Sequence, residues 1–235
     1  EFGTLGVRVS GRWAWFAWRT GLDQFGPPGA GLRIWLEKGL PLGSGLGSSG
    51  ASAVAAALAT CALVSPETPR EALLSACREG ERHATGSPHP DNVAPSLLGG
   101  LVACVARPTA LDAEAIEVVQ LPMIDGLWIA AVKPDVEIRT ADARAVLPTH
   151  VPMQDVVANL GAMASLVAGL ATGDLAQIGR ALTDQIATPY RRGLIPGYDA
   201  VVAAARDAGA VGAGISGSGP TVFALVEGAD LAHRV

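Results

Sequence analysis

The stretch Gly43–Ser49 combines three glycines with three serines, residue types that suit chemistry on an anion. An alternating apolar run over residues 32–38 precedes it and an Ala-rich run over residues 50–64 follows it, which predicts a strand, a glycine loop and the N-terminus of a helix. A helix N-terminus offers unpaired backbone N–H groups and the positive end of the helix dipole, and glycine lets the backbone approach an anion closely. The loop therefore predicts a phosphate site, with the Ser48 and Ser49 hydroxyls available to phosphate oxygens or Mg²⁺.

Other interpretations of the same glycines differ in what they require nearby. Residues 45–50 read G-x-G-x-x-G, but a dinucleotide-binding turn lies near the start of its chain and has an acidic residue at the end of a second strand about 20 residues later. Here Glu67 and Glu71 lie at a predicted helix start instead. A Walker A loop is excluded because no Lys-Ser/Thr pair follows the glycines. A tight turn that needs glycine for its backbone conformation alone stays open.

Composition and charge limit the classes of protein that this chain can represent. It has 235 residues, of which 49% are hydrophobic, and a formal net charge of −5. This predicts a compact folded chain, and the acidic balance without a Lys/Arg block argues against nucleic-acid or acidic-membrane partners. Cys61, Cys77 and Cys104 lack metal-site spacing and are interpreted as thiols in a reducing cytosol, the first two buried. We recognise no signal peptide and no apolar run long enough to cross a bilayer.

The elements that position the chemical residues form two predicted halves with a boundary near residues 101–108. Thr68 as a cap, Pro69 in the first turn and Glu71 three residues after the cap predict a helix from residue 68 to about residue 82. Thr140 is expected to cap another helix. The remaining helices are expected over residues 50–64, 91–98, 140–147, 153–171, 175–186 and 196–208, and strands over residues 3–18, 32–38, 101–106, 116–119, 128–132, 211–215 and 221–226.

Two strings resemble a known family. Pro41–Ser49 resembles the ATP-binding loop of the GHMP small-molecule kinases, and Gly214–Thr221 is similar to their C-terminal glycine motif. Further strings resemble the homoserine kinase family within that superfamily: His89–Pro95 with Leu98–Gly100, Thr140–Pro148, and Pro189–Arg191 before Leu194–Gly197. The resemblance covers roughly residues 32 to 226.

The resemblance implies a fold and an activity. The fold is the two-domain α+β fold of GHMP kinases, with a ribosomal protein S5 domain 2-like half in residues 1–103 and a ferredoxin-like half in residues 104–235. The activity is ATP-dependent phosphorylation of the hydroxyl of L-homoserine in threonine biosynthesis, with ATP and Mg²⁺ as cofactors. The resemblance also implies a homodimer, whereas the expectation of a cytoplasmic protein without nucleic-acid or membrane partners rests on the cysteines, the net charge and the apolar runs described above. Two alternatives stay open, another GHMP kinase acting on a small alcohol such as mevalonate, and a non-catalytic member of the superfamily.

Residue roles follow from the same resemblance. The nucleotide-binding residues are Pro41, Leu42, Gly43, Ser44, Gly45, Leu46, Gly47, Ser48 and Ser49. Mg²⁺ is assigned to Ser49 and Glu81, although Glu81 by itself, flanked by Glu79 and Arg82, is typical of a solvated helix surface. The substrate-binding residues are His89, Asn92, Thr140, Arg144, Arg191 and Gly217, and the catalytic ones are Ser49, Glu81, Asn92 and Arg144. Guanidinium groups suit the substrate carboxylate, and Arg192 is an alternative to Arg191.

The sequence also departs from the family pattern. Residues 3–9 do not match the Asn-x-Gly-x-Gly-Phe-Asp type motif of the family's N-terminus, and Gly50 stands where members usually have Ala. We therefore expect the N-terminal domain to lack that motif. We expect the C-terminal domain to be truncated before the family's last helices and strand. No catalytic base is assigned, and the hydroxyl proton is expected to pass to a phosphate oxygen.

Overall fold

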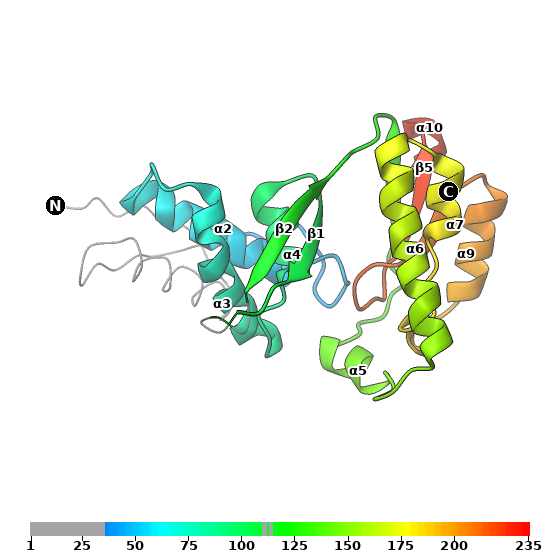
Figure 1. Ribbon diagram of the computed structural model, residues 1–235, viewed down its shortest axis with the longest axis horizontal. Coiled ribbons are helices and arrows are strands. Elements are labelled where there is room, and N and C mark those ends of the chain that lie inside the picture. The colour runs from blue at the N-terminus through cyan, green and yellow to red at the C-terminus, as the bar shows by residue number, and fades with distance from the viewer. Residues whose placement is uncertain (1–35, 110–111, 113–114) are drawn as a thin grey trace. The chain divides into compact units, whose positions relative to one another are not determined.

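A computed structural model describes residues 36–109, 112 and 115–235 (Figure 1). By their contacts the described residues fall into two compact units, one with residues up to Pro41 and Gly47–Gln120, the other with Leu42–Leu46 and Leu121–Val235. The contacts thus group residues 104–120 with the first unit, whereas the sequence assigned them to the C-terminal domain. The glycine loop changes unit between Leu46 and Gly47.

The first unit is mainly helical. It holds α2 (Ser48–Val64), the 3₁₀ turn η1 (Arg70–Leu73), α3 (Leu74–Thr85), α4 (Pro90–Leu98) and a two-stranded sheet of β1 (Leu101–Ala106) and β2 (Ile116–Leu121). Small side chains on α2 allow close packing against α3 and α4. The shared core consists of Val54, Ala57, Cys61, Leu73, Cys77, Val93 and Leu97.

The second unit is built on an antiparallel sheet with strand order β3 (Leu127–Val132), β5 (Val222–Glu227) and β4 (Gly212–Ile215). Ala224 of β5 lies opposite Ala130 on one side and Ala213 on the other. Its helices are α5 (Thr140–Ala145), α6 (Met153–Thr172), α7 (Leu175–Ala181), α8 (Thr188–Arg191), the 3₁₀ turn η2 (Arg192–Leu194), α9 (Tyr198–Asp207) and α10 (Ala229–Ala232). The core of this unit includes Ile138, Ala143, Ile195, Tyr198, Val202, Ala213, Val222 and Ala224.

Most predicted elements are confirmed, and the exceptions have local causes. The helix predicted from Thr68 begins as η1 at Arg70, with Pro69 as the N-cap, because the Thr68 hydroxyl donates to Ser65 Oγ at 2.9 Å instead of capping. The helix predicted over residues 175–186 ends at Ala181. Residues 36–38 are irregular, and the remainder of that predicted strand, like the strand over residues 3–18, lies outside the described residues.

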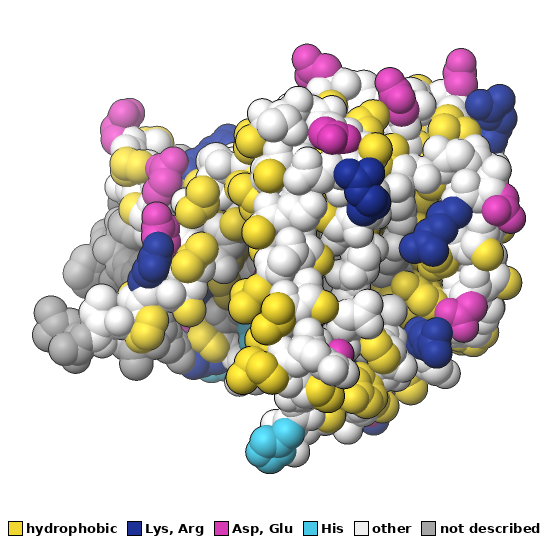
Figure 2. All heavy atoms as spheres, turned by 45° about the vertical axis from the view of Figure 1, so that its right-hand side comes forward, with side chains coloured by type: hydrophobic (Ala, Val, Ile, Leu, Met, Phe, Trp, Pro, Cys, Tyr) yellow, Lys and Arg dark blue, Asp and Glu magenta, His cyan; other side chains and the backbone are white. Residues whose placement is uncertain are grey.

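The sequence predicted no apolar run long enough to cross a bilayer, but helix α6 is long and apolar enough to do so by length and composition. Helix α6 has 20 residues, and an 18-residue window within it has a mean hydropathy of 1.4 and is only 11% buried. Polar residues such as Asp155 and Asn159 interrupt the apolar run in sequence, which is why an uninterrupted run was not recognised. Its exposed apolar side chains are Met153, Val157, Leu160, Met163 and Val167, and Figure 2 shows hydrophobic side chains gathered on this face.

The cysteine expectation is confirmed for the described thiols. Cys61 and Cys77 are buried and unpaired, and Cys104 is partly buried. Burial raises the pKa of the Cys77 thiol to about 12. A thiol that stays protonated at neutral pH is a poor nucleophile, so Cys77 is a core residue.

Candidate functional site

The N-terminus of α2 carries the serines of the glycine loop. Gly47 precedes the helix with φ 74°, and Ser48 and Ser49 are its first residues. The first turn of α2 has no acidic side chain of its own to offset the positive end of the helix dipole. Lys38 Nζ donates to Ser48 Oγ at 3.3 Å, and partial burial lowers the pKa of that ammonium group. The result is a positive helix end with two hydroxyls and a lysine beside it.

Glu81 meets this helix end from α3. Its side chain is only 2% exposed, and Ser49 Oγ donates to Glu81 Oε1 at 3.2 Å. The other carboxylate oxygen, Oε2, is also buried. Burying a carboxylate is costly unless hydrogen bonds or a cation compensate for the lost water. The interpretation of Glu81 as a solvated surface residue is therefore wrong.

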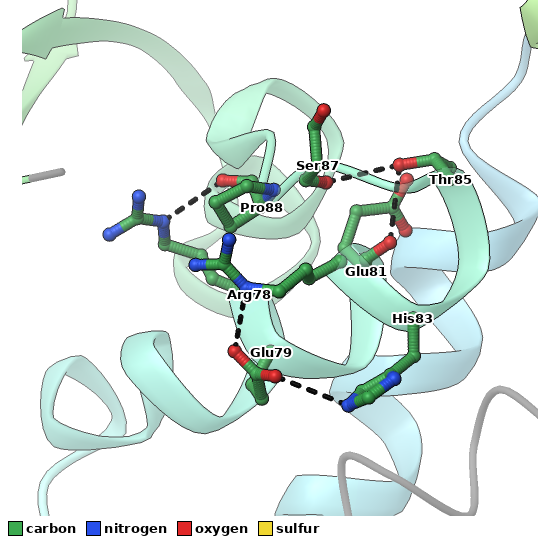
Figure 3. A network of polar contacts seen from close by, with 8 residues as sticks. Arg78, Glu79, Glu81, His83, Thr85, Ser87 and Pro88 are labelled. Carbon is green, nitrogen blue, oxygen red and sulfur yellow. Dashed lines mark hydrogen bonds and ion pairs between the residues drawn. The ribbon is translucent and has the colours of Figure 1, made fainter.

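Glu79, two residues earlier, supplies the contrast. It is 36% exposed and forms an ion pair with Arg82 at 2.9 Å, and His83 Nε2 lies 3.2 Å from its Oε1 (Figure 3). The backbone carbonyl of Glu81 accepts a hydrogen bond from Thr85 on the same helix. The helix thus presents Glu79 to a surface ion-pair cluster while it buries Glu81 against Ser49.

Asn92 packs against the same loop and helix start. A Cβ on Gly47 would lie 2.9 Å from Asn92 Oδ1, and one on Gly50 would lie 3.0 Å from Asn92 Cβ. This close approach explains why the chain has glycine at residue 50. His89 is the N-cap of α4, but its side chain is exposed and makes no capping hydrogen bond. The structure therefore brings Asn92 to the loop, whereas it leaves His89 on the surface.

In the second unit, Gly43–Leu46 dock on the loop between β4 and β5. Ser216 Oγ donates to Gly45 O at 2.9 Å, and Thr221 N donates to Ser44 O at 3.2 Å. Gly45 has φ +77°, and a Cβ there would overlap the backbone oxygens of Ser216 and Gly219. The two glycine motifs are thus held together by one backbone hydrogen bond and one from the Ser216 hydroxyl, and the approach of the two backbones leaves no room for a side chain at Gly45.

Arg191 is held by two backbone carbonyls of this unit. Its Nε donates to Ala143 O at 3.1 Å and its Nη1 to Gly217 O at 3.1 Å. Burial lowers the pKa of Arg191; the Asp184 carboxylate opposes this, whereas Arg144 adds to the lowering. The predicted pair Arg144 and Arg191 therefore lies close enough to interact electrostatically.

The structure also tests two further sequence predictions, Arg192 as an alternative to Arg191 and Thr140 as a helix cap. Arg192 is exposed and pairs with Asp199 Oδ1 at 3.3 Å, so it does not share the contacts of Arg191. Thr140 does not cap α5, because Arg139 is the N-cap and no side chain caps that end. The capping prediction for Thr140 is wrong, since the helix already includes Thr140 as its first residue.

A cavity of about 450 Å³ in the second unit is lined by Arg191 and Gly217. Asn159, Asp184 and Thr188 also face it. Asp184 accepts hydrogen bonds from three backbone N–H groups. Burial would raise its pKa, but hydrogen bonds from Ala187, Ile186, Asn159 and Thr188 lower that pKa to about 2. Asp184 is therefore ionised at neutral pH.

Sequence reasoning missed Lys38, Ser216 and Asp184. Lys38 is one of only two lysines in the chain, which singles it out next to a phosphate loop. Ser216 belongs to the second glycine motif, but the motif alone does not predict that the Ser216 hydroxyl donates to Gly45 O. Asp184 falls within the helix predicted over residues 175–186, so it was not expected to have a role of its own. An Asp a few residues before Thr-Pro is nevertheless typical of a turn that starts a new helix.

Metal ligands are few in the part of the chain that the structure describes. No three His, Cys, Asp or Glu side chains cluster there as a metal site. Mg²⁺ needs only one or two protein carboxylates when it is bound together with phosphates. The half-buried Ser49 hydroxyl and the buried Glu81 carboxylate fit that kind of site.

Comparisons with known proteins agree with this arrangement. Residues 13–100 match the GHMP kinases N terminal domain, and residues 166–235 match GHMP kinases C terminal. The chain is 44% identical to a homoserine kinase of Chlorobium phaeovibrioides, covering 86% of this chain and 61% of that protein. It is also 44% identical to a homoserine kinase of Pyrococcus horikoshii, covering 84% of this chain and 64% of that protein. The chain thus spans less than two thirds of the length of these curated relatives.

Solved structures give the fold. A crystal structure of a homoserine kinase from Cytophaga hutchinsonii matches with a TM-score of 0.87 and 42% identity, covering 94% of this chain and 68% of that one. A mevalonate kinase from L. major, at 17% identity and a TM-score of 0.69 over 94% of this chain and 70% of that one, shows the same fold. The predicted α+β fold of GHMP kinases is confirmed, and the chain belongs to the GHMP kinase family.

Proposed function

We propose that this protein transfers the γ-phosphoryl group of ATP to the side-chain hydroxyl of L-homoserine, giving O-phospho-L-homoserine and ADP. The observation that carries the choice of acceptor is the 44% identity to curated homoserine kinases over 84–86% of this chain. The geometry of each unit supports the roles of particular residues.

The nucleotide phosphates are assigned to Gly43–Ser49. Gly43, Gly45 and Gly47 have positive φ angles, which turn successive backbone N–H groups in a way that suits anions. The 17-residue helix α2 adds its positive end, and Lys38 adds a cation. Pro41 and Leu42 are proposed to flank the bound nucleotide.

Ser49 and Glu81 are proposed to hold Mg²⁺. Their oxygens lie 3.2 Å apart, and burial of Glu81 gives a carboxylate that a cation would stabilise. Bound Mg²⁺ would neutralise charge on the phosphate oxygens. Ser49 and Glu81 themselves contribute fixed oxygens at the end of α2, so little rearrangement is needed to receive the ion.

The substrate carboxylate is assigned to Arg191 and Arg144. Arg191 is oriented by Ala143 O and Gly217 O, which fixes the plane of its guanidinium group. A planar fork of N–H donors suits a carboxylate better than a lysine would. Asn92, Thr140, His89 and Gly217 are proposed as further substrate contacts.

The reaction forms a bond between the homoserine oxygen and the γ-phosphorus and breaks the bond from that phosphorus to the β–γ bridging oxygen. The hydroxyl proton passes to a phosphate oxygen, and no side chain is assigned as base. Catalysis of phosphoryl transfer comes mainly from positioning and charge stabilisation. The chain would provide these through the loop 43–49 and through the guanidinium of Arg191, which two backbone carbonyls orient.

Coupled measurement of ADP release with Mg·ATP tests this function against its alternatives. We expect turnover with L-homoserine and little with mevalonate or galactose. Turnover of mevalonate but not homoserine would assign a different acceptor. Absence of Mg·ATP binding in calorimetry would favour a non-catalytic member of the family.

We further propose that the protein acts in the cytoplasm as a homodimer, with small molecules as its only ligands. Light scattering during size-exclusion chromatography would check the oligomeric state. A monomer at assay concentration would contradict the dimer without affecting the proposed reaction.

A further inference from the structure

Asp184 forms a dense set of hydrogen bonds in the turn between α7 and α8. Its Oδ1 accepts from Ile186 N at 2.8 Å and from Ala187 N at 3.1 Å. Its Oδ2 accepts from Ala187 N at 3.1 Å, Thr188 N at 2.7 Å and Thr188 Oγ1 at 3.0 Å. One carboxylate therefore fixes three consecutive residues of the backbone.

A second side chain reaches this turn from α6. Asn159 Nδ2 donates to Asp184 Oδ1 at 3.1 Å, and Asn159 Oδ1 accepts from Gln185 N at 2.8 Å. The amide thus bonds both to the carboxylate and to the turn that the carboxylate organises. Because α6 is a 20-residue helix, this contact anchors the turn to a rigid element.

The turn leads directly into Arg191. Helix α8 has only four residues, too few to be stable without tertiary support. Arg191 N donates to Ala187 O at 3.0 Å, so the residue that Asp184 holds also holds the backbone of Arg191. Fixing the backbone sets where the guanidinium group meets Ala143 O and Gly217 O.

Asp184 and Arg191 face the same cavity of about 450 Å³. Nε and Nη1 of Arg191 are used by backbone carbonyls. Within the described ranges no hydrogen bond of its Nη2 is found, so this edge remains available to a ligand in the cavity. The two hydrogen bonds of Arg191 therefore orient its guanidinium group and leave Nη2 without a hydrogen bond to the described residues.

We propose that Asp184, supported by Asn159, is a positioning residue for carboxylate recognition, acting through the turn 184–188 on Arg191. This rests on the proposed function, in which Arg191 binds the substrate carboxylate. Asp184 itself touches neither substrate nor phosphate in this role. It determines whether the chain can select an acceptor that carries a carboxylate.

The kinetic test compares L-homoserine with 3-aminopropan-1-ol, which has the same amino and hydroxyl groups but no carboxylate. For D184N we expect the KM for homoserine to rise roughly tenfold to hundredfold, as for the loss of charge-assisted hydrogen bonds. The KM for ATP and the turnover of 3-aminopropan-1-ol should stay near the wild-type values. N159A should change the same constants in the same direction but less, and it decides the matter if D184N does not fold.

The control variant is D174N. Asp174 caps α7 through Gln177 N at 2.8 Å, so its loss weakens a cap of similar kind that does not lead to Arg191. We expect D174N to keep the wild-type KM for homoserine. Equal losses for both acceptors in D184N, or an unchanged KM for homoserine in D184N and N159A, would overturn the proposal.

A readout that does not need turnover separates this inference from the proposed function. The ¹⁵N–¹H resonance of Arg191 Nε, assigned by its absence in R191K, reports the hydrogen bond to Ala143 O. It should shift and broaden in D184N and N159A but not in D174N. If the wild-type protein does not phosphorylate homoserine, the proposed function fails; this resonance then decides the positioning role, and an unchanged signal overturns it.

Discussion

The two units hold their candidate functional residues in different ways. In the first unit the contact between Ser49 and Glu81 joins two side chains from two helices, and the carboxylate is almost fully buried. In the second unit each such contact involves a backbone atom: Gly45 O accepts from the Ser216 hydroxyl, Arg191 donates to the Ala143 carbonyl, and Asp184 accepts mainly from backbone N–H groups of its own turn. Substitutions in the first unit should therefore change chemistry with little effect on folding, whereas those in the second should change geometry and stability together.

Glu81→Gln is expected to have the largest effect on catalysis. Gln keeps the shape and one acceptor for Ser49 but loses the charge that would hold Mg²⁺, so kcat should fall by about hundredfold or more. The thermal midpoint should not fall, because removing a buried charge lowers its desolvation cost. Steady-state ADP release and a thermal melt check both parts.

Glu79→Gln is the matched control. Glu79 lies two residues away on the same helix, is 36% exposed and pairs with Arg82 on the surface. The Glu79→Gln variant should keep kcat within about twofold, because Glu79 does not contact Ser49. Its stability should hardly change, because surface ion pairs contribute little to the free energy of unfolding. If the Glu81→Gln variant were as active as Glu79→Gln, Glu81 would not be a metal ligand. The proposed difference between the two units would then also be wrong.

Gly45→Ala should give the largest loss of stability. The new Cβ would meet Ser216 O and would lie 2.7 Å from Gly219 O, at a residue with φ +77°. We expect unfolding of this variant to be easier by roughly 1–3 kcal/mol, together with weaker ATP binding. Urea denaturation and calorimetry with Mg·ATP measure the two effects.

Gly39→Ala separates strain at the loop from a general effect of removing glycine. Gly39 has open space around the Cβ position and no positive φ, so stability should stay the same or rise slightly. If Gly45→Ala unfolded at the same urea concentration as Gly39→Ala, backbone docking would not be what holds the second unit's part of the loop.

The sequence was sufficient where short-range patterns decide the structure. The Ala-rich run after Ser49 has no competing turn signal, and β1 lies over the predicted residues 101–106. The pattern failed where a side chain has several partners to choose from. Thr68 had the spacing of a capping box, but its hydroxyl donates to Ser65, a choice that depends on the turn before the helix.

The sequence predicted the motifs of the candidate site, but it did not predict the tertiary contacts that hold the site residues in place. Glu81 was identified only through a family resemblance, because burial depends on how α3 packs against α2. Asp184 could not be separated from a helix by periodicity alone, since the apolar spacing continues through Ile186. Its role depends on Asn159, 25 residues away, which no local pattern connects to it.

Asp184→Asn should have a moderate, pH-dependent effect on stability. The folded pKa of about 2 lies below the ordinary Asp value near 3.9, so the folded state gains stability above that ordinary value and loses it as pH falls toward 2. At pH 7 the variant should be less stable by about 1 kcal/mol, as for loss of a helix cap. The difference should shrink between about pH 5 and pH 2. Urea denaturation over pH 3 to 8 measures it, and a difference that does not change with pH would contradict the assignment.

Lys38 should give the smallest effect, and it sharpens the comparison because it is a side chain at the phosphate loop of the first unit. Lys38→Gln is expected to raise the KM for ATP by roughly threefold to tenfold without lowering stability, because the ammonium group is only partly buried. The chain's second lysine, Lys133, is an internal control, since its Nζ donates to Pro134 O and Val136 O in the second unit. Mg·ATP should slow reductive methylation of Lys38 but not of Lys133, measured by peptide mass spectrometry. Equal protection of both lysines, or of neither, would place Lys38 outside the phosphate site.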